Sequence, residues 1–144
     1  MPNALPVYPT TAAPVKRGRG DRLLSDRRHR PEQALHRAVF EHICWRGRAG
    51  TFAFHPANGG ARSGIEAAIM KGFGVVAGVP DLIIIHNGRV FGLELKAANG
   101  RLSPAQRDVH ERLRAAGAEV AVAVGLDEAL QQLADWQLLR GAQP

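Results

Sequence analysis

Two acidic residues and a lysine, Asp81, Glu94 and Lys96, follow one another in an order that suits chemistry on phosphate esters. Hydrolysis of a phosphodiester needs a cation to neutralise charge on phosphorus, a water nucleophile, and a positive group near that water or the phosphate. Carboxylate ligands that leave room for water and phosphate suit Mg²⁺ or Mn²⁺. The three residues therefore predict a metal-dependent site that cuts phosphodiester bonds.

The segment between the two acidic residues is predicted to be a β-hairpin, because Asn87-Gly88 lies between two apolar runs. A two-residue turn sets a register that puts Asp81 directly opposite Glu94, with Cβ atoms about 5 Å apart. Such like charges are destabilising unless something offsets them, and a divalent cation would do so. Strand alternation places Lys96 on the same face as Glu94. The alternative is a surface ion pair between Glu94 and Lys96, with Asp81 capping a turn.

Several short motifs extend this pattern along the chain and together resemble one family. They are Gly78-Val79-Pro80-Asp81-Leu82, Glu94-Leu95-Lys96, Gly100-Arg101-Leu102-Ser103-Pro104-Ala105-Gln106 and Ala115-Ala116-Gly117-Ala118. Over about residues 32–124 the chain resembles the VRR-NUC (virus-type replication-repair nuclease) branch of the PD-(D/E)xK nucleases. The resemblance implies a restriction-endonuclease-like core, hydrolysis of nucleic-acid phosphodiesters with Mg²⁺ or Mn²⁺, and Asp81, Glu94 and Lys96 as catalytic positions. It also implies a homodimer that acts on branched DNA such as Holliday junctions.

Two more positions match the family less strictly and are candidate catalytic residues, Glu32 and Gln106. Gln106 is predicted in the first turn of a helix, where it can orient a metal-bound water, contact a phosphate, or only cap the helix. Glu32 is predicted at the start of the first helix, where an acidic residue is also favourable for the helix dipole. We assign Asp81, Glu94 and Leu95 as the metal ligands.

The remaining sequence predicts an α/β fold with a central mixed sheet of about four strands flanked by helices. Ser63 and Ser103-Pro104 are typical helix starts, and the strand-helix-strand unit after the hairpin is expected to be a right-handed crossover. The predicted strands are 51–54, the hairpin 79–97, and 119–124. The predicted helices are 31–47, 64–71, 104–116, and a last helix capped by Asp127 that runs to about residue 139.

The net charge of +6 is concentrated at the N-terminus. Residues 1–30 hold seven Lys and Arg against two Asp, a net charge of +5, so residues 31–144 carry only +1. We interpret residues 1–30 as a flexible basic arm and residues 31–144 as the nuclease domain. The arm can bind phosphate and speed association with DNA, or it is a solubilising tail or an artefact of translation start. Candidate phosphate contacts, each with a plain surface role as the alternative, are Arg62, Lys71, Arg101 and Arg107.

Composition excludes several other classes of protein. The chain has 144 residues, enough for one domain with a core, and no apolar run approaches the roughly 18 residues of a membrane span. Prolines interrupt the N-terminus where a secretory signal would need an apolar stretch, so we expect a cytoplasmic protein. Cys44 is alone, which rules out an internal disulfide and a cysteine-based zinc site. None of the six histidines has zinc-site spacing, and for His55 we favour a surface or structural role over one at a substrate cleft.

Two alternatives to an active nuclease come from other classes. One is a nucleic-acid-binding protein with a decayed site, against which the intact Asp81, Glu94 and Lys96 argue. The other is an assembly module whose basic arm binds an acidic partner. For a nuclease, cutting two strands symmetrically is simplest with a two-fold pair of sites, which favours a homodimer.

Overall fold

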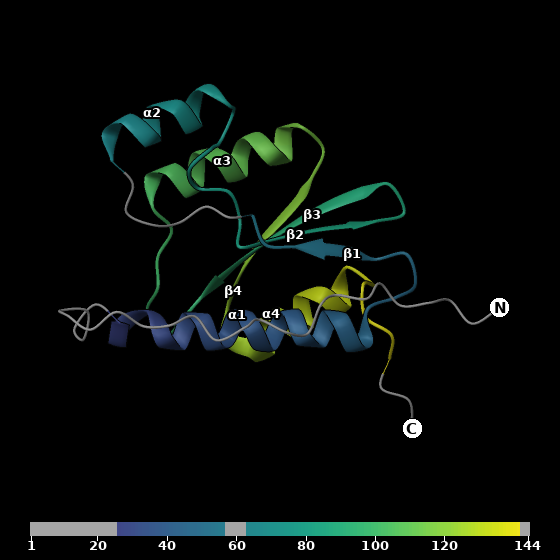
Figure 1. The fold of residues 1–144 in the computed structure, drawn as a ribbon. Helices are drawn as coiled ribbons and strands as arrows, with labels where there is room; N and C mark the ends of the chain where they lie inside the picture. Colours follow the sequence, from purple (N-terminus) through teal and green to yellow (C-terminus); the bar gives the residue numbers. More distant parts are fainter. Residues whose placement is uncertain (1–25, 57–62, 142–144) are drawn as a thin grey trace, which may run out of the picture.

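The computed structural model describes residues 26–56 and 63–141. They form a four-stranded mixed sheet with helices on both faces, which is the predicted α/β class (Figure 1). Most of the predicted basic arm lies outside the described residues. Among the described residues, no helix is long and apolar enough to cross a membrane. In chain order the elements are α1 Asp26–Arg46, β1 Phe52–Phe54, α2 Gly64–Gly72, β2 Leu82–His86, β3 Arg89–Lys96, α3 Pro104–Ala115, β4 Glu119–Val124 and α4 Gly125–Asp135.

The strands are ordered β1-β2-β3-β4, with β1, β2 and β3 antiparallel and β3 and β4 parallel. In the hairpin, Leu82 pairs with Leu93, so the next position in register places Asp81 opposite Glu94, as predicted. The turn residue Asn87 has φ 49° and Gly88 has φ 73°. Positive φ at both positions belongs to the type I′ turn, whose twist matches that of the two strands.

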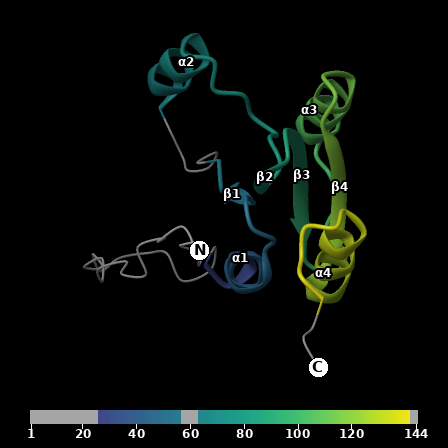
Figure 2. The same cartoon turned by 90° about the vertical axis from the view of Figure 1, so that its right-hand side faces the viewer.

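One face of the sheet is covered by α1 and α4, which lie side by side beneath it (Figures 1 and 2). The apolar residues at alternate positions of β2 and β3 point to this face, as period-2 patterning requires. Phe91 packs on Trp136 with ring centroids 5.1 Å apart. The core is closed by Val39, Ile43, Ala53, Leu82, Ile84, Phe91, Leu93, Leu95, Ala123, Ala129, Leu133, Trp136, Leu138 and Leu139.

The other face carries α3, which starts at the predicted N-cap Ser103 and has its first turn closed by a capping box. The Ser103 hydroxyl accepts from the Gln106 N–H at 3.2 Å, and the Gln106 side chain accepts from the Ser103 N–H at 2.9 Å. Val109 and His110 are the buried residues of this helix. α3 therefore has its first turn fixed by Gln106, one of the candidate catalytic residues.

Helix α2 stands apart from the sheet on the α3 side (Figure 2). Its start also follows the prediction, because Ser63 and Glu66 form a capping box. None of its residues is buried, although the helix is largely apolar. A considerable apolar surface is thus left open by the single chain.

Three helix boundaries were predicted wrongly, the start of α1 and both ends of α4. α1 begins at Asp26, so Pro31 lies inside the helix and removes one main-chain hydrogen bond, because proline lacks an N–H. Asp127 does not cap α4: the chain turns from β4 directly into the helix at Gly125, with φ +80°, and the N-cap is Val124. The helix ends at Asp135 rather than near residue 139, because Leu139 leaves it to bridge to Gly47.

Candidate active site

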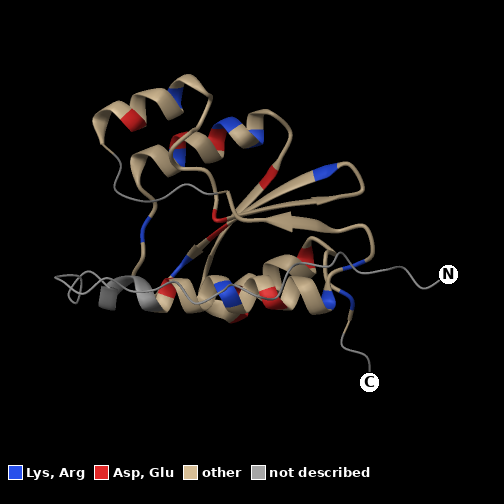
Figure 3. Cartoon of the chain, in the orientation of Figure 1, with Lys and Arg blue, Asp and Glu red and all other residues tan. Residues whose placement is uncertain are grey.

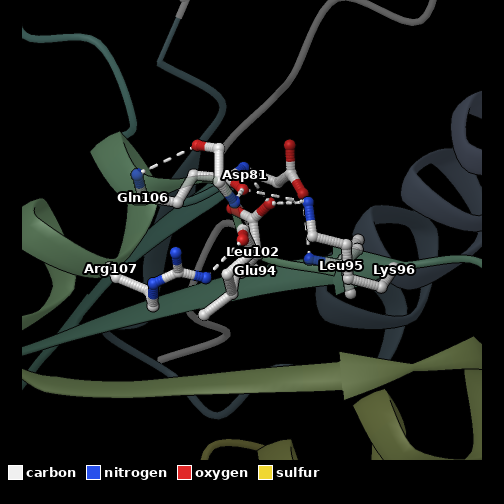
Figure 4. Close-up of polar contacts among 8 residues, drawn as sticks. Asp81, Glu94, Leu95, Lys96, Leu102, Gln106 and Arg107 are labelled. Carbon is white, nitrogen blue, oxygen red and sulfur yellow. Dashed lines mark hydrogen bonds and ion pairs between the residues drawn. The ribbon is translucent and has the colours of Figure 1, made fainter. Parts of the chain in front are cut away.

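Glu94 and Lys96 lie at the end of β3 and meet Gln106 from the first turn of α3 (Figure 4). The Nζ atom of Lys96 lies 2.7 Å from Oε1 of Glu94. The Nε2 atom of Gln106 donates to the same Oε1 at 2.5 Å, while its Oε1 accepts from Lys96 at 3.3 Å. The structure thus brings three of the five candidate catalytic side chains into one contact cluster.

Asp81 joins this cluster through the backbone of β3. Its Oδ2 atom accepts a hydrogen bond of 2.9 Å from the N–H of Leu95, which lies between Glu94 and Lys96 (Figure 4). In a strand, the N–H and C=O of one residue point to the same neighbouring strand. The carbonyl of Leu95 is therefore directed to the Asp81 side of β3, where β2 has not yet begun.

Close packing of the Gly78 to Pro80 segment holds the start of β2 next to α3. Gly78 has φ +91°, and a Cβ there would come within 2.6 Å of the main chain of Ala105. Pro80 is buried against Gly92, where a Cβ would lie 2.9 Å from its ring. These two glycines let Asp81 approach both β3 and the helix that carries Gln106.

Electrostatics at the cluster favour an added cation. Burial raises the pKa of Glu94, the negative charge of Asp81 adds to this, and Lys96 opposes it. The Oε2 atom of Glu94 is buried without a hydrogen-bond partner, and an unpaired buried oxygen costs free energy. A cation on Oε2 would satisfy that oxygen and lessen the repulsion between the two carboxylates.

The donor atoms at this position are the Glu94 and Asp81 carboxylates and the Leu95 carbonyl, all oxygens as Mg²⁺ and Mn²⁺ prefer. No group of three or more His, Cys, Asp or Glu side chains that could hold a metal occurs in 26–56 and 63–141. An ion here would therefore keep several water or phosphate oxygens, which is the usual behaviour of Mg²⁺. The residues fit such an ion.

The other predicted residues lie outside this cluster. Glu32 is partly buried on α1, and no described hydrogen bond or ion pair joins it to the carboxylates or the lysine. Lys71 is exposed near the end of α2, Arg101 is exposed in the loop after β3, and Arg62 lies outside the described residues. Arg107 donates to the main-chain oxygen of Leu102 at 2.8 Å (Figure 4). Acidic and basic positions follow one another at the end of β3, and further charges lie on the helices (Figure 3).

Three histidines lie closer to the cluster than their scattered positions in the sequence indicated. His55 follows β1, and its Nδ1 lies 2.6 Å from the main-chain oxygen of Asp81. His36 packs on His55, and its pKa is lowered by burial and by His55 against the opposing charge of Asp81. His110 is 1% exposed with both ring nitrogens unpartnered. Its pKa is lowered by burial and then by nearby positive charges, including Lys96, against Asp81.

Two acidic residues and a lysine thus lie at the open end of a hairpin in a mixed α/β sheet. The sequence profile of the VRR-NUC domain matches residues 25–127. The chain belongs to the VRR-NUC family, which is a nuclease family, and this confirms the resemblance seen in its motifs.

Solved structures agree with this assignment. A structure titled "VRR_NUC domain protein" is 27% identical, with a TM-score of 0.53 over 72% of this chain and 84% of its own. A second, titled "VRR_NUC domain", is 23% identical, with a TM-score of 0.50 over 72% of this chain and 94% of its own, and supports the fold alone. A comparison with curated proteins gave no match.

Proposed function

We propose that this chain is a Mg²⁺- or Mn²⁺-dependent DNA endonuclease whose catalytic residues are Asp81, Glu94 and Lys96. The observation that carries the proposal is the connected cluster of these side chains with Gln106, beside a buried unpaired oxygen of Glu94. A cation bound there would supply charge neutralisation at the phosphate and a more acidic water. The family assignment supports the nuclease activity, and the oxygen donors support the choice of ion.

The side chains of the chain have separate roles in this proposal. Asp81 and Glu94, with the carbonyl of Leu95, hold the ion. Lys96 keeps a positive charge beside the reacting phosphate or water, and its side chain is 12% exposed, so solvent screens that charge little. Gln106 contacts Lys96 and Glu94 at once and fixes their relative positions. Glu32 remains a candidate for orienting water from α1.

The substrate we propose is branched DNA such as a Holliday junction. The exposed basic residues Lys71, Arg101 and Arg107 are phosphate contacts in this proposal. Phosphate contacts fix orientation without reading bases, so they suit recognition of the shape of the DNA. Residues 1–30 add positive charge that would speed association at low salt.

We also propose a homodimer formed through α2 and through the exposed apolar side chains of β1 and β2. Large apolar side chains are exposed on both elements, and a single folded chain rarely leaves such a surface open. Two copies of α2 that pack through its apolar side would each bury Ile65, Ile69 and Phe73 against the other, as the self-complementary interface of a two-fold dimer requires. The exposed residues are Phe52, Phe54, Ile65, Ile69, Met70, Phe73, Val75 and Ile85.

The test is cleavage of labelled four-way junction, flap, single-stranded and duplex DNA, and of RNA, with Mg²⁺, with Mn²⁺ and with a chelator. We expect metal-dependent cleavage with the junction cut fastest. Cleavage of none of these substrates, with binding retained, would favour a decayed nucleic-acid-binding protein. Equal cleavage of junction and linear duplex would refute the structure selectivity but not the nuclease.

A further inference from the structure

Asp81 stands just outside the β-ladder that aligns the rest of its strand. The pairing of β2 with β3 begins at Leu82, and the pairing of β1 with β2 ends at Phe54 with Ile83. The backbone oxygen of Asp81 therefore has no partner in the sheet and is contacted by His55 at 2.6 Å instead. A side chain thus extends the contact between β1 and β2 beyond the last pair of the ladder.

The chemistry of this contact fixes the form of the His55 ring. A carbonyl oxygen only accepts, so Nδ1 of His55 carries the proton and donates it. The ring of His36, from α1, lies edge-on to that of His55 with centroids 4.5 Å apart at 66°. Such an edge-to-face arrangement restricts the ring that makes the hydrogen bond. Asp81 is consequently connected to α1 through two histidine rings.

We propose that His55, supported by His36, is a positioning residue that holds Asp81 in the orientation required of a metal ligand. The proposal rests on the proposed metal-dependent function. Two hydrogen bonds then define Asp81: the N–H of Leu95 holds its carboxylate and the ring of His55 holds its carbonyl. Loss of either hydrogen bond would allow Asp81 to change its orientation relative to β3.

A residue that orients a metal ligand typically changes metal affinity or activity by about 10- to 100-fold when removed. His55→Ala and His55→Phe should therefore weaken Mn²⁺ binding and lower kcat by a factor of about 10 or more. KM for DNA should change little, because no DNA contact is removed. His55→Asn should recover most of the loss, because its side-chain N–H stands as many bonds from the backbone as Nδ1 does.

His86 provides a matched control. Its Nδ1 lies 3.0 Å from the hydroxyl of Thr51, so it also ties β1 to β2, but at the turn end of the strands. His86→Ala should lower the free energy of unfolding to a similar extent as His55→Ala and leave Mn²⁺ affinity unchanged. This separates a loss of local order at Asp81 from a general weakening of the sheet.

The experiment combines Mn²⁺ calorimetry, single-turnover cleavage and the NMR shift of the Leu95 amide in the metal-free full chain. We expect the amide shift to move in His55→Ala and His55→Phe, and to be retained in His55→Asn and His86→Ala. If all four variants keep the wild-type amide shift and Mn²⁺ affinity, the positioning role is wrong. If the wild type neither binds Mn²⁺ nor cleaves DNA, the proposed function fails, and the amide shift alone still decides whether His55 orients Asp81.

Discussion

The carboxylate of Asp81 accepts the main-chain N–H of Leu95 at 2.9 Å, which ties the first acidic residue to the backbone between Glu94 and Lys96. The same geometry directs the Leu95 carbonyl toward Asp81. The backbone bond thus places the Asp81 carboxylate beside the strand end from which the Glu94 and Lys96 side chains leave.

Asp81→Asn and Glu94→Gln should each abolish cleavage while leaving the fold and most DNA binding intact. Each change removes one ligand charge and retains the shape of the side chain. Calorimetric titration with Mn²⁺ should show weaker binding in both variants, and circular dichroism should match the wild type. Normal cleavage with unchanged Mn²⁺ affinity in either variant would contradict the assignment of that residue.

Lys96→Ala and Lys96→Arg should both lose nearly all cleavage but keep metal binding. An ammonium is not a ligand for a divalent cation, and a guanidinium is too large and planar to occupy the same point. The alanine variant also leaves Glu94 buried without its ion partner, which should lower the free energy of unfolding in chelator by about 3 kcal/mol.

Urea unfolding with and without Mg²⁺ measures this effect, because an ion that binds only the folded protein should recover part of the loss. Lys96→Met, which keeps the packing of the side chain but not its charge, is the control for shape. Wild-type cleavage by Lys96→Ala would show that Lys96 has no catalytic role.

Gln106 closes the capping box of α3 and donates to Glu94, and one pair of variants can separate these two roles. Gln106→Glu preserves the acceptor of the capping box but replaces the donor to Glu94 with a second negative charge. We expect it to fold normally and cleave poorly. Ser103→Ala removes the hydroxyl cap, which should cost about 1 kcal/mol, and should leave cleavage unchanged. Equal losses of cleavage in the two variants would mean that Gln106 acts only through the helix.

Acid should destabilise the metal-free protein partly through His110. Its pKa is lowered in the fold, so below its ordinary value of 6.5 the unfolded chain binds a proton that the folded chain does not. Stability from this group is complete above pH 6.5 and is lost as pH falls from there to the lowered pKa. His110→Leu should flatten the decline, measured by urea unfolding between neutral and mildly acidic pH. His36 acts in the same direction, so part of the decline should remain. The same slope in variant and wild type would contradict the prediction.

If the proposed dimer forms through α2, disruption of this helix should convert it to monomer. Phe73 is 81% exposed in the single chain, and Phe73→Glu together with Ile69→Glu places charge in the proposed interface. Trp45, 78% exposed on α1, provides a matched control, and Trp45→Glu should leave the dimer intact. Sedimentation at micromolar concentration measures both. A monomeric wild type that still resolves junctions would refute the dimer.

Much of the fold was predictable because its signals are local. Asn87-Gly88 fixed the turn and hence the register of Asp81 with Glu94, and the Ser63 and Ser103 caps marked two helix starts. Gln106 was predicted in the first helical turn after Lys96 from a local signal, but its contact with Glu94 was not named.

The histidine contacts were not predictable because they depend on long-range pairing. His55 reaches Asp81 only through the register of β1 with β2, and no turn joins those strands to set it. His36 adds the docking of α1, which packing of the whole core decides. The predicted end of α4 was wrong for a similar reason. Leu138 and Leu139 are buried in the core, and this packing ends the helix at Asp135 although the sequence pattern favours helix further on.

The hairpin turn also limits how this sequence can change over time. Asp81 lies six residues before Asn87, and Glu94 lies six residues after Gly88. The turn therefore sets the register of both carboxylates. A substitution at the turn changes its strain, whereas one inserted residue would move Glu94 to the opposite face relative to Asp81. Homologues should therefore tolerate a new residue type at the tip of the hairpin more readily than a change in the length of the turn. This holds although the tip lies at the opposite end of the strands from Asp81 and Glu94.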